Sequence, residues 1–270
     1  FYNKEYVNKY LDALDKEIKS NYKKEVITSL YIGGGTPSSL SIDELKKLFN
    51  ILEIFNLSKD CEITFESNPD SLSLDKIKLL KKHGINRVSL GVETINKRLQ
   101  EILERKTNKD DVIRCINNLK TNGITNINVD LIYAINGESI NDLKNDLNFL
   151  LSLVVPHIST YSLIIEDNTK LKINNVKNID KSIDREMYDM ISDTLKDNNY
   201  LHYEISNFAK EGYQSKHNLK YWYNLEYYGF GCGASGYINN IRYTNTRSIS
   251  KYIKGKTIID KEILTIKDKM

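Results

Sequence analysis

The chain has 270 residues with 39 basic and 36 acidic side chains, a formal net charge of +3. Apolar residues make up 40% and charged residues 28%, a balance typical of globular proteins that excludes a largely disordered chain. The charges are interspersed, which argues against a nucleic-acid partner. No apolar run approaches the roughly 18 residues that a membrane span needs. The odd count of 3 cysteines favours a reducing compartment over a disulfide framework.

Strand and helix patterns alternate along the first two-thirds of the chain. Short β-branched or aromatic runs predict six strands, at residues 26–32, 62–65, 87–92, 127–133, 158–164 and 202–205. Amphipathic spacing and capping residues predict helices at 6–18, 41–52, 74–82, 97–104, 110–121, 139–155 and 184–196. Parallel neighbours need a crossover, so the alternation predicts an α/β fold with a parallel sheet, either a partial barrel or a doubly wound open sheet.

In both architectures the functional residues lie at the carboxyl ends of the strands. Glycines 33–35 follow the first predicted strand, Glu66 follows the second, Glu93 ends the third and Asp130 lies near the end of the fourth. Carboxylates gathered at one edge repel one another and need a cationic partner, a ligand or solvent, and Arg105 is a candidate for the cation. The glycine run permits close approach of a ligand, although a tight turn explains it equally well when it is taken alone.

Several segments together are more specific than any of them alone. They are residues 31–38 (YIGGGTPS), 66–69 (ESNP), 86–92 (NRVSLGV), 128–133 (NVDLIY), 203–209 (YEISNFA), 217–222 (HNLKYW) and 228–234 (YGFGCGA). In this order and at this spacing they resemble the radical S-adenosylmethionine (SAM) proteins related to oxygen-independent coproporphyrinogen III oxidase, and within these the HemW-type heme chaperone branch. The resemblance covers nearly the whole chain and implies a partial (β/α)₆ barrel of the radical SAM type with a C-terminal extension.

The resemblance also implies roles for individual residues. The positions that match SAM-contacting positions of the family are Gly34, Gly35, Thr36, Glu66, Glu93, Arg105 and Asp130. Glu93 stands where glutamine is usual in the family and adds a negative charge beside the SAM pocket. Without the resemblance, Asp130 would be read as a structural acceptor at a strand end and Arg105 as an exposed helix residue.

The family binds a four-iron four-sulfur cluster through three closely spaced cysteines, and this chain has no such motif. Cys61, Cys115 and Cys232 are separated by 54 and 117 residues, too far apart in sequence to replace it. The start at Phe1 and Tyr2 matches the continuation just after the family's last cluster ligand, so we expect the cluster cysteines upstream of Phe1 and no metal site within the chain. We also expect the chain to be truncated before a small helical domain.

The segment 217–222 suggests a heme site. If it is helical, His217 and Tyr221 share a face, and imidazole can ligate iron while the indole of Trp222 stacks on a porphyrin. The alternative is a hydrogen-bonded histidine and a tryptophan packed in the core. The resemblance ties the motif to heme, so we place His217, Tyr221 and Trp222 in a candidate heme site.

The sequence is compatible with three functions. The first is a heme chaperone that delivers heme to respiratory acceptors, the second an oxygen-independent coproporphyrinogen III oxidase that decarboxylates porphyrinogen propionates, and the third a SAM-binding barrel without redox activity. The resemblance implies three cofactors: SAM, a 4Fe-4S cluster and heme. It implies heme or porphyrin and membrane-bound heme acceptors as partners. It also implies a homodimer. We expect a cytoplasmic protein, peripheral to the membrane, with a radical SAM core over residues 1–200 and the last strand and extension over 201–270.

Overall fold

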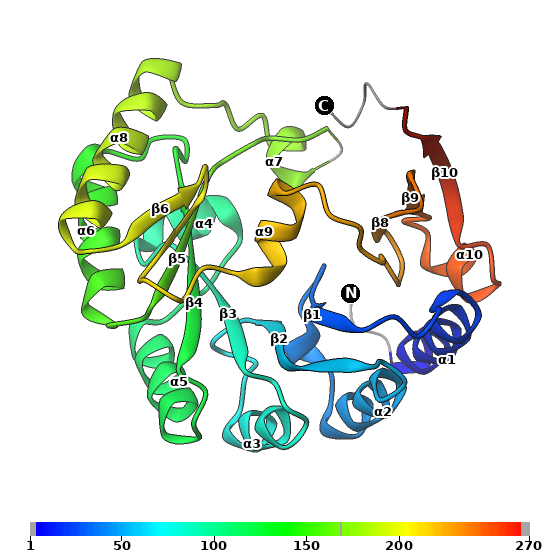
Figure 1. Ribbon diagram of the computed structural model, residues 1–270. Coiled ribbons are helices and arrows are strands. Elements are labelled where there is room, and N and C mark those ends of the chain that lie inside the picture. Colours follow the sequence, from blue (N-terminus) through cyan, green and yellow to red (C-terminus); the bar gives the residue numbers. More distant parts are fainter. Residues whose placement is uncertain (1–3, 168, 266–270) are drawn as a thin grey trace. The chain divides into compact units, whose positions relative to one another are not determined.

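The computed structural model describes residues 4–167 and 169–265, so Phe1 and Tyr2 lie outside the described residues. Contacts between residues divide the chain into two compact units, Phe1–Ile63 with Ser215–Met270 and Thr64–Gln214. The larger sheet has the strand order β1-β2-β3-β4-β5-β7-β6, and the smaller sheet has the order β10-β9-β8 (Figure 1). The strand β2 (Leu57–Ser67) contains the boundary between the two units.

The first unit combines both ends of the chain. Its elements are α1 (Lys4–Asn21), β1 (Ile27–Ile32), the 3₁₀ helix η1 (Pro37–Ser39), α2 (Ile42–Leu52), the first half of β2, α9 (Lys216–Trp222), β8 (Ser235–Ile238), β9 (Ile241–Asn245), α10 (Ile249–Ile253) and β10 (Ile258–Ile263). Leu11, Leu14 and Ile18 lie on one face of α1 and pack with Leu48 and Ile51 of α2. The predicted capping box at the start of α2 is present.

The second unit holds most of the parallel sheet. Its elements are the end of β2, α3 (Leu74–Lys82), β3 (Arg87–Glu93), α4 (Lys97–Leu103), α5 (Lys109–Thr121), β4 (Asn126–Tyr133), α6 (Ile140–Ser152), β5 (His157–Ser162), α7 (Lys170–Ile173), α8 (Lys181–Asp197), β6 (Leu201–Glu204) and β7 (Asn207–Ala209). The pairs β2–β3, β3–β4 and β4–β5 are parallel, and α3, α5, α6 and α8 lie around the outside of these strands (Figure 1). The α/β fold class with a parallel sheet is therefore confirmed.

The sixth predicted strand is present but does not pair with the fifth. The three-residue strand β7 lies between them and is antiparallel to both β5 and β6. A turn at Ile205 and Ser206 reverses the chain, and the Thr160 amide donates to the Ser206 carbonyl over 2.7 Å. Three residues are too few to show an alternating pattern, so the sequence does not predict β7. Among the described residues, no helix is both long and apolar enough to cross a membrane.

Candidate functional site

The strands of the second unit present one apolar and one polar face. Phe65, Val88, Leu90, Ile127, Val129 and Ile158 are completely buried on the apolar face. The alternate residues share the other face because the strands pair in parallel register. We call this surface the polar face, and its residues are Thr64, Glu66, Arg87, Ser89, Asn126, Asn128, Asp130, His157, Ser159 and Tyr161. A parallel sheet is normally apolar on both sides, so a polar face this extensive indicates a binding surface.

Asp130 lies on β4, in the part of the polar face toward the carboxyl ends of the strands. Its carboxylate accepts a hydrogen bond from the Asn128 side-chain amide over 2.7 Å and a longer one from the Ser89 hydroxyl over 3.4 Å. Loss of hydration raises the pKa of Asp130 to about 6, against the opposing effect of hydrogen bonds from Asn128 and Ser159 and of the Arg87 charge. The nearby carboxylate of Glu66 adds to the rise. The charged form of such a buried carboxyl group is stabilised by a ligand that donates a hydrogen bond or carries positive charge.

His157 anchors the polar face from β5. Its side chain is completely buried, with Nδ1 2.6 Å from Asn128 Oδ1 and Nε2 2.7 Å from the Tyr203 hydroxyl. Burial, together with the charge of Arg87, holds the imidazole pKa well below its ordinary value, so the ring is neutral at physiological pH. With both ring nitrogens engaged, His157 orients Asn128 and, through it, Asp130.

Glu93 and Arg105 form an ion pair at the end of β3. Arg105 Nε lies 2.8 Å from Glu93 Oε2, and the Glu93 side chain is largely buried while that of Arg105 is 45% exposed. Glu93 adopts φ 64°, at an irregularity in the pairing of β3 with β4. A residue other than glycine in this left-handed region carries strain, which is typical of functional positions. The prediction that Arg105 neutralises a carboxylate at this edge is confirmed, and the carboxylate is that of Glu93.

Burial raises the pKa of Glu93 even though the Arg105 charge and its hydrogen bond act to lower it. Glu66 is half-buried and shares the polar face with Asp130, in register with Ser89. The second unit therefore brings Glu66, Glu93, Arg105 and Asp130 to the carboxyl ends of its strands. The first unit contains the other three residues predicted to contact SAM.

Those three residues lie in the loop after β1. Gly34 has φ 84° and Gly35 an ordinary φ, and a Cβ built on either glycine would meet no atom within 4 Å. Thr36 precedes η1, and its side chain does not cap that helix. The positive φ shows that the turn requires Gly34, whereas nothing in the fold requires Gly35 to lack a side chain.

The helix α9 holds the candidate heme residues in the first unit. His217 Nδ1 lies 3.0 Å from Ser29 Oγ on β1, its Nε2 lies 2.9 Å from the Tyr221 hydroxyl, and its ring stacks on Tyr31 with centroids 5.0 Å apart. Trp222 is 53% exposed, so the alternative that it packs in the core is wrong. Exposed side chains of Tyr221, Tyr223 and Leu225 accompany it.

A buried carboxylate fixes the start of α9. Glu62 on β2 accepts hydrogen bonds from the backbone amides of Lys216 and His217 over 3.1 and 3.0 Å and from the Ser215 hydroxyl over 3.2 Å. Neither Ser29 nor Glu62 is predicted from the sequence as a residue of this site. Each is a polar residue in a predicted buried strand. Such a residue is expected to form a hydrogen bond, but the sequence does not identify the partner.

The cysteines do not fit an iron–sulfur cluster. Cys61 and Cys115 are buried, and burial raises the pKa of their thiols to about 11 and about 12. The Cys232 thiol donates to the Thr246 carbonyl over 3.0 Å. Cluster ligands are thiolates, which these environments disfavour. Across residues 4–167 and 169–265, no three His, Cys, Asp or Glu side chains lie close enough to hold a metal ion.

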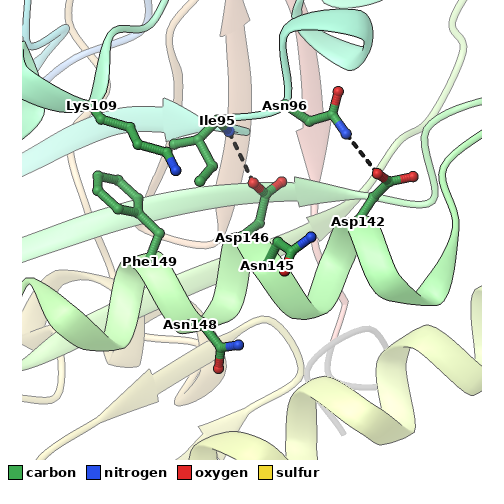
Figure 2. Close-up of a pocket in the computed structure, with 8 residues that line it drawn as sticks. All are labelled: Ile95, Asn96, Lys109, Asp142, Asn145, Asp146, Asn148 and Phe149. Atoms are coloured by element: carbon green, nitrogen blue, oxygen red, sulfur yellow. Dashed lines mark hydrogen bonds between the residues drawn. The ribbon is translucent and has the colours of Figure 1, made fainter.

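A polar pocket of about 500 Å³ lies on the helical side of the second unit (Figure 2). Its carboxylates accept hydrogen bonds from the surrounding chain. Asp146 accepts one from the Ile95 backbone amide over 3.0 Å, and Asp142 accepts one from the Asn96 side-chain amide over 2.7 Å. Both carboxylates thus fix α6 to the loop before α4. Because their oxygens are already engaged, we do not assign a ligand to this pocket.

Comparisons with known proteins identify the superfamily to which the chain belongs. Residues 2–150 match the model of the Radical SAM superfamily. The structure of coproporphyrinogen III oxidase (HemN) from Escherichia coli has the same fold, with a TM-score of 0.87 and 21% identity over 99% of this chain and 68% of that one. This likeness confirms the predicted α/β partial barrel of the radical SAM type.

Relatives with similar sequences identify the family within this superfamily. Heme chaperone HemW from Lactococcus lactis is 40% identical over 98% of this chain and 72% of its own length, and HemW from Bacillus subtilis is 38% identical over 92% and 68%. HemW from Escherichia coli K12 is 31% identical over 98% and 71%. The chain belongs to the radical SAM superfamily and, within it, to the family of the heme chaperone HemW.

Proposed function

We propose that this protein is a heme chaperone that binds heme at α9 and passes it to membrane-bound respiratory acceptors. The observation that carries the proposal is the combination of a positioned imidazole, His217, with the exposed rings of Trp222 and Tyr223. Flat aromatic surfaces favour stacking on a macrocycle, and an imidazole is a common iron ligand. The names of the relatives agree with this function.

The contacts of His217 suggest which nitrogen would ligate iron. We assign the Nδ1–H as the donor to Ser29 Oγ, which leaves the Nε2 lone pair to accept from the Tyr221 hydroxyl. Iron would then replace the Tyr221 hydrogen bond at Nε2, while Ser29 keeps the ring oriented. This is the usual arrangement of a metal-bound imidazole, whose other nitrogen donates to a protein acceptor.

Substitutions at this site test the proposal. We expect His217→Ala to weaken heme binding and shift the Soret band, and Tyr221→Phe to strengthen binding a few-fold because it removes the group that competes with iron at Nε2. Thermal melts of each variant control for folding. An unchanged Soret band in a folded His217→Ala protein would contradict the proposal.

We also propose that SAM binds at Gly34, Gly35, Thr36, Glu66, Glu93, Arg105 and Asp130. Gly35→Ala gives a clean test, because the added methyl group meets no protein atom within 4 Å and φ needs no change. We expect its melting temperature to match that of the wild type, while SAM affinity falls at least about tenfold, or roughly 1.4 kcal/mol. Unchanged affinity would mean that the glycine run only forms a turn.

The oxidase is the alternative to the chaperone. Conversion of coproporphyrinogen III to protoporphyrinogen IX over several turnovers, with SAM and a reductant present, would reverse this assignment. A cytoplasmic location next to the membrane, a homodimer, and a division into a core over residues 1–200 and an extension over 201–270 belong to the same proposal.

A further inference from the structure

Three neighbouring side chains on the polar face have buried polar atoms without partners. Thr64 of β2 is in register with Arg87 of β3, which is in register with Asn126 of β4. Within the described chain, Thr64 Oγ1, Arg87 Nε and Asn126 Oδ1 find no hydrogen-bond partner. We call these three residues the Arg87 row.

Arg87 is the unusual member of the row, because its side chain carries a permanent charge. Arg87 is only 2% exposed, and no ion pair joins it to an acidic residue in the described parts of the chain. Buried charges in proteins are normally paired, since desolvation of an isolated ion is costly. Nearby Asp130 responds to the Arg87 charge, but its hydrogen bonds come from Asn128, Ser89 and Ser159 and not from Arg87.

The polar face becomes more exposed toward the carboxyl ends of the strands. Thr64 and His157 are completely buried, Asp130 is half-buried, and Tyr161 is 44% exposed. A ligand would therefore reach the Arg87 row from the same edge that bears Glu66 and Asp130. The row would meet the end of the ligand that enters furthest.

We propose that the Arg87 row binds a carboxylate group of the ligand held on the polar face. The guanidinium matches a carboxylate in charge and geometry, and the Thr64 hydroxyl supplies a second donor. The Asn126 side-chain amide can present either its oxygen or its nitrogen. Resting on the proposed function, two ligands offer this chemistry: the amino-acid carboxylate of SAM and a propionate of a tetrapyrrole.

Matched probes with and without the carboxylate test the inference and separate its two sources. Binding of SAM is compared with binding of decarboxylated SAM, and binding of protoporphyrin IX with that of its dimethyl ester. The proteins are the wild type, Arg87→Met, Arg87→Lys and the control Arg114→Met, which removes an exposed arginine paired with Asp111 on α5.

We expect Arg87→Met to bind one carboxylate probe at least about tenfold more weakly than the wild type and to bind its carboxylate-free analogue like the wild type. The affinity of Arg87→Lys for that probe should lie between those of Arg87→Met and the wild type. The control Arg114→Met should bind every probe like the wild type. The probe that loses affinity identifies the source. Equal losses for a probe and its analogue, or no loss for either probe, would overturn the inference. If Arg87→Met does not fold, Arg87→Lys decides, because an ammonium lacks the planar fork and unchanged binding of both probes would also overturn it. If no tetrapyrrole binds, the proposed function fails while the SAM arm still tests the row.

Discussion

At the scale of single residues, Glu93 pairs with Arg105, a cation that the proposed SAM site would otherwise offer to its ligand. Its carboxylate is largely buried and pairs with Arg105 over 2.8 Å. We expect Glu93→Gln to raise SAM affinity about 3- to 10-fold, on the order of 1 kcal/mol, because Arg105 becomes available and a negative charge is removed. Isothermal titration calorimetry measures the change.

Glu104→Gln is the matched control, since Glu104 pairs with Lys170 at the surface. This variant should bind SAM like the wild type, because exposed ion pairs contribute little. Equal or weaker SAM binding by Glu93→Gln would show that the Glu93 carboxylate itself contributes to binding, for example through the SAM amino group.

Asp130 makes stability depend on pH in a defined window. Its folded pKa of about 6 lies above the ordinary value of 3.8, so the folded state holds the proton more strongly than the unfolded chain. Stability should therefore fall as pH rises from about 4 to about 6 and stay lower above that range. We expect Asp130→Asn to remove this contribution and to raise stability at pH 8 by on the order of 2 kcal/mol, or a few degrees in Tm.

Melting curves of the wild type and Asp130→Asn between pH 4 and pH 8 measure this effect. The two proteins should differ least at pH 4, where the carboxyl group is protonated. A variant that is less stable than the wild type at pH 8 would show that the Asp130 charge contributes to the fold, through Arg87 or Asn128, more than its desolvation costs.

At the scale of elements, α9 combines a rigid start with an exposed end. Glu62 and Ser29 hold its first turn, whereas Trp222 at its last residue is 53% exposed. We expect Trp222→Ala to change stability by less than about 1 kcal/mol while it weakens heme binding, because an exposed ring adds little to the core. Chemical denaturation and a heme titration on the same sample measure the two effects.

Tyr252 on α10 gives the contrast within the same unit. It is completely buried and donates a hydrogen bond to Glu17, so Tyr252→Ala should cost about 3–5 kcal/mol. If Trp222→Ala were as destabilising as Tyr252→Ala, the surface around Trp222 would be part of the core and not a binding surface.

At the scale of the whole molecule, the three cysteines decide what this chain can assemble by itself. Cys61 and Cys115 are buried thiols with raised pKa values, and Cys232 is hydrogen-bonded to a backbone carbonyl. We expect the chain to bind no four-iron cluster after anaerobic reconstitution, because a cluster needs closely spaced thiolates. Iron and sulfide analysis, with the absorbance at roughly 400 nm that thiolate-ligated clusters show, measures the result, and stoichiometric iron and sulfide would contradict it.

The sequence by itself determined the order of the main elements. Arg87–Glu93 and Asn126–Tyr133 are strands as predicted, and Ser41 caps α2 through Glu44, because alternation and capping are local properties. The family resemblance also came from the sequence alone, since its motifs are short and ordered along the chain. The polar face was foreseeable in part, because polar residues alternate with apolar ones along three strands.

Only the tertiary structure decided which of these groups meet. His217 contacts Ser29 across 188 positions, Ser159 contacts Asn207 across 48, and β7 inserts antiparallel between β5 and β6. The unpartnered atoms of the Arg87 row likewise follow from the register of three strands. Local propensities do not determine such pairings, because register and burial depend on segments far apart in the chain.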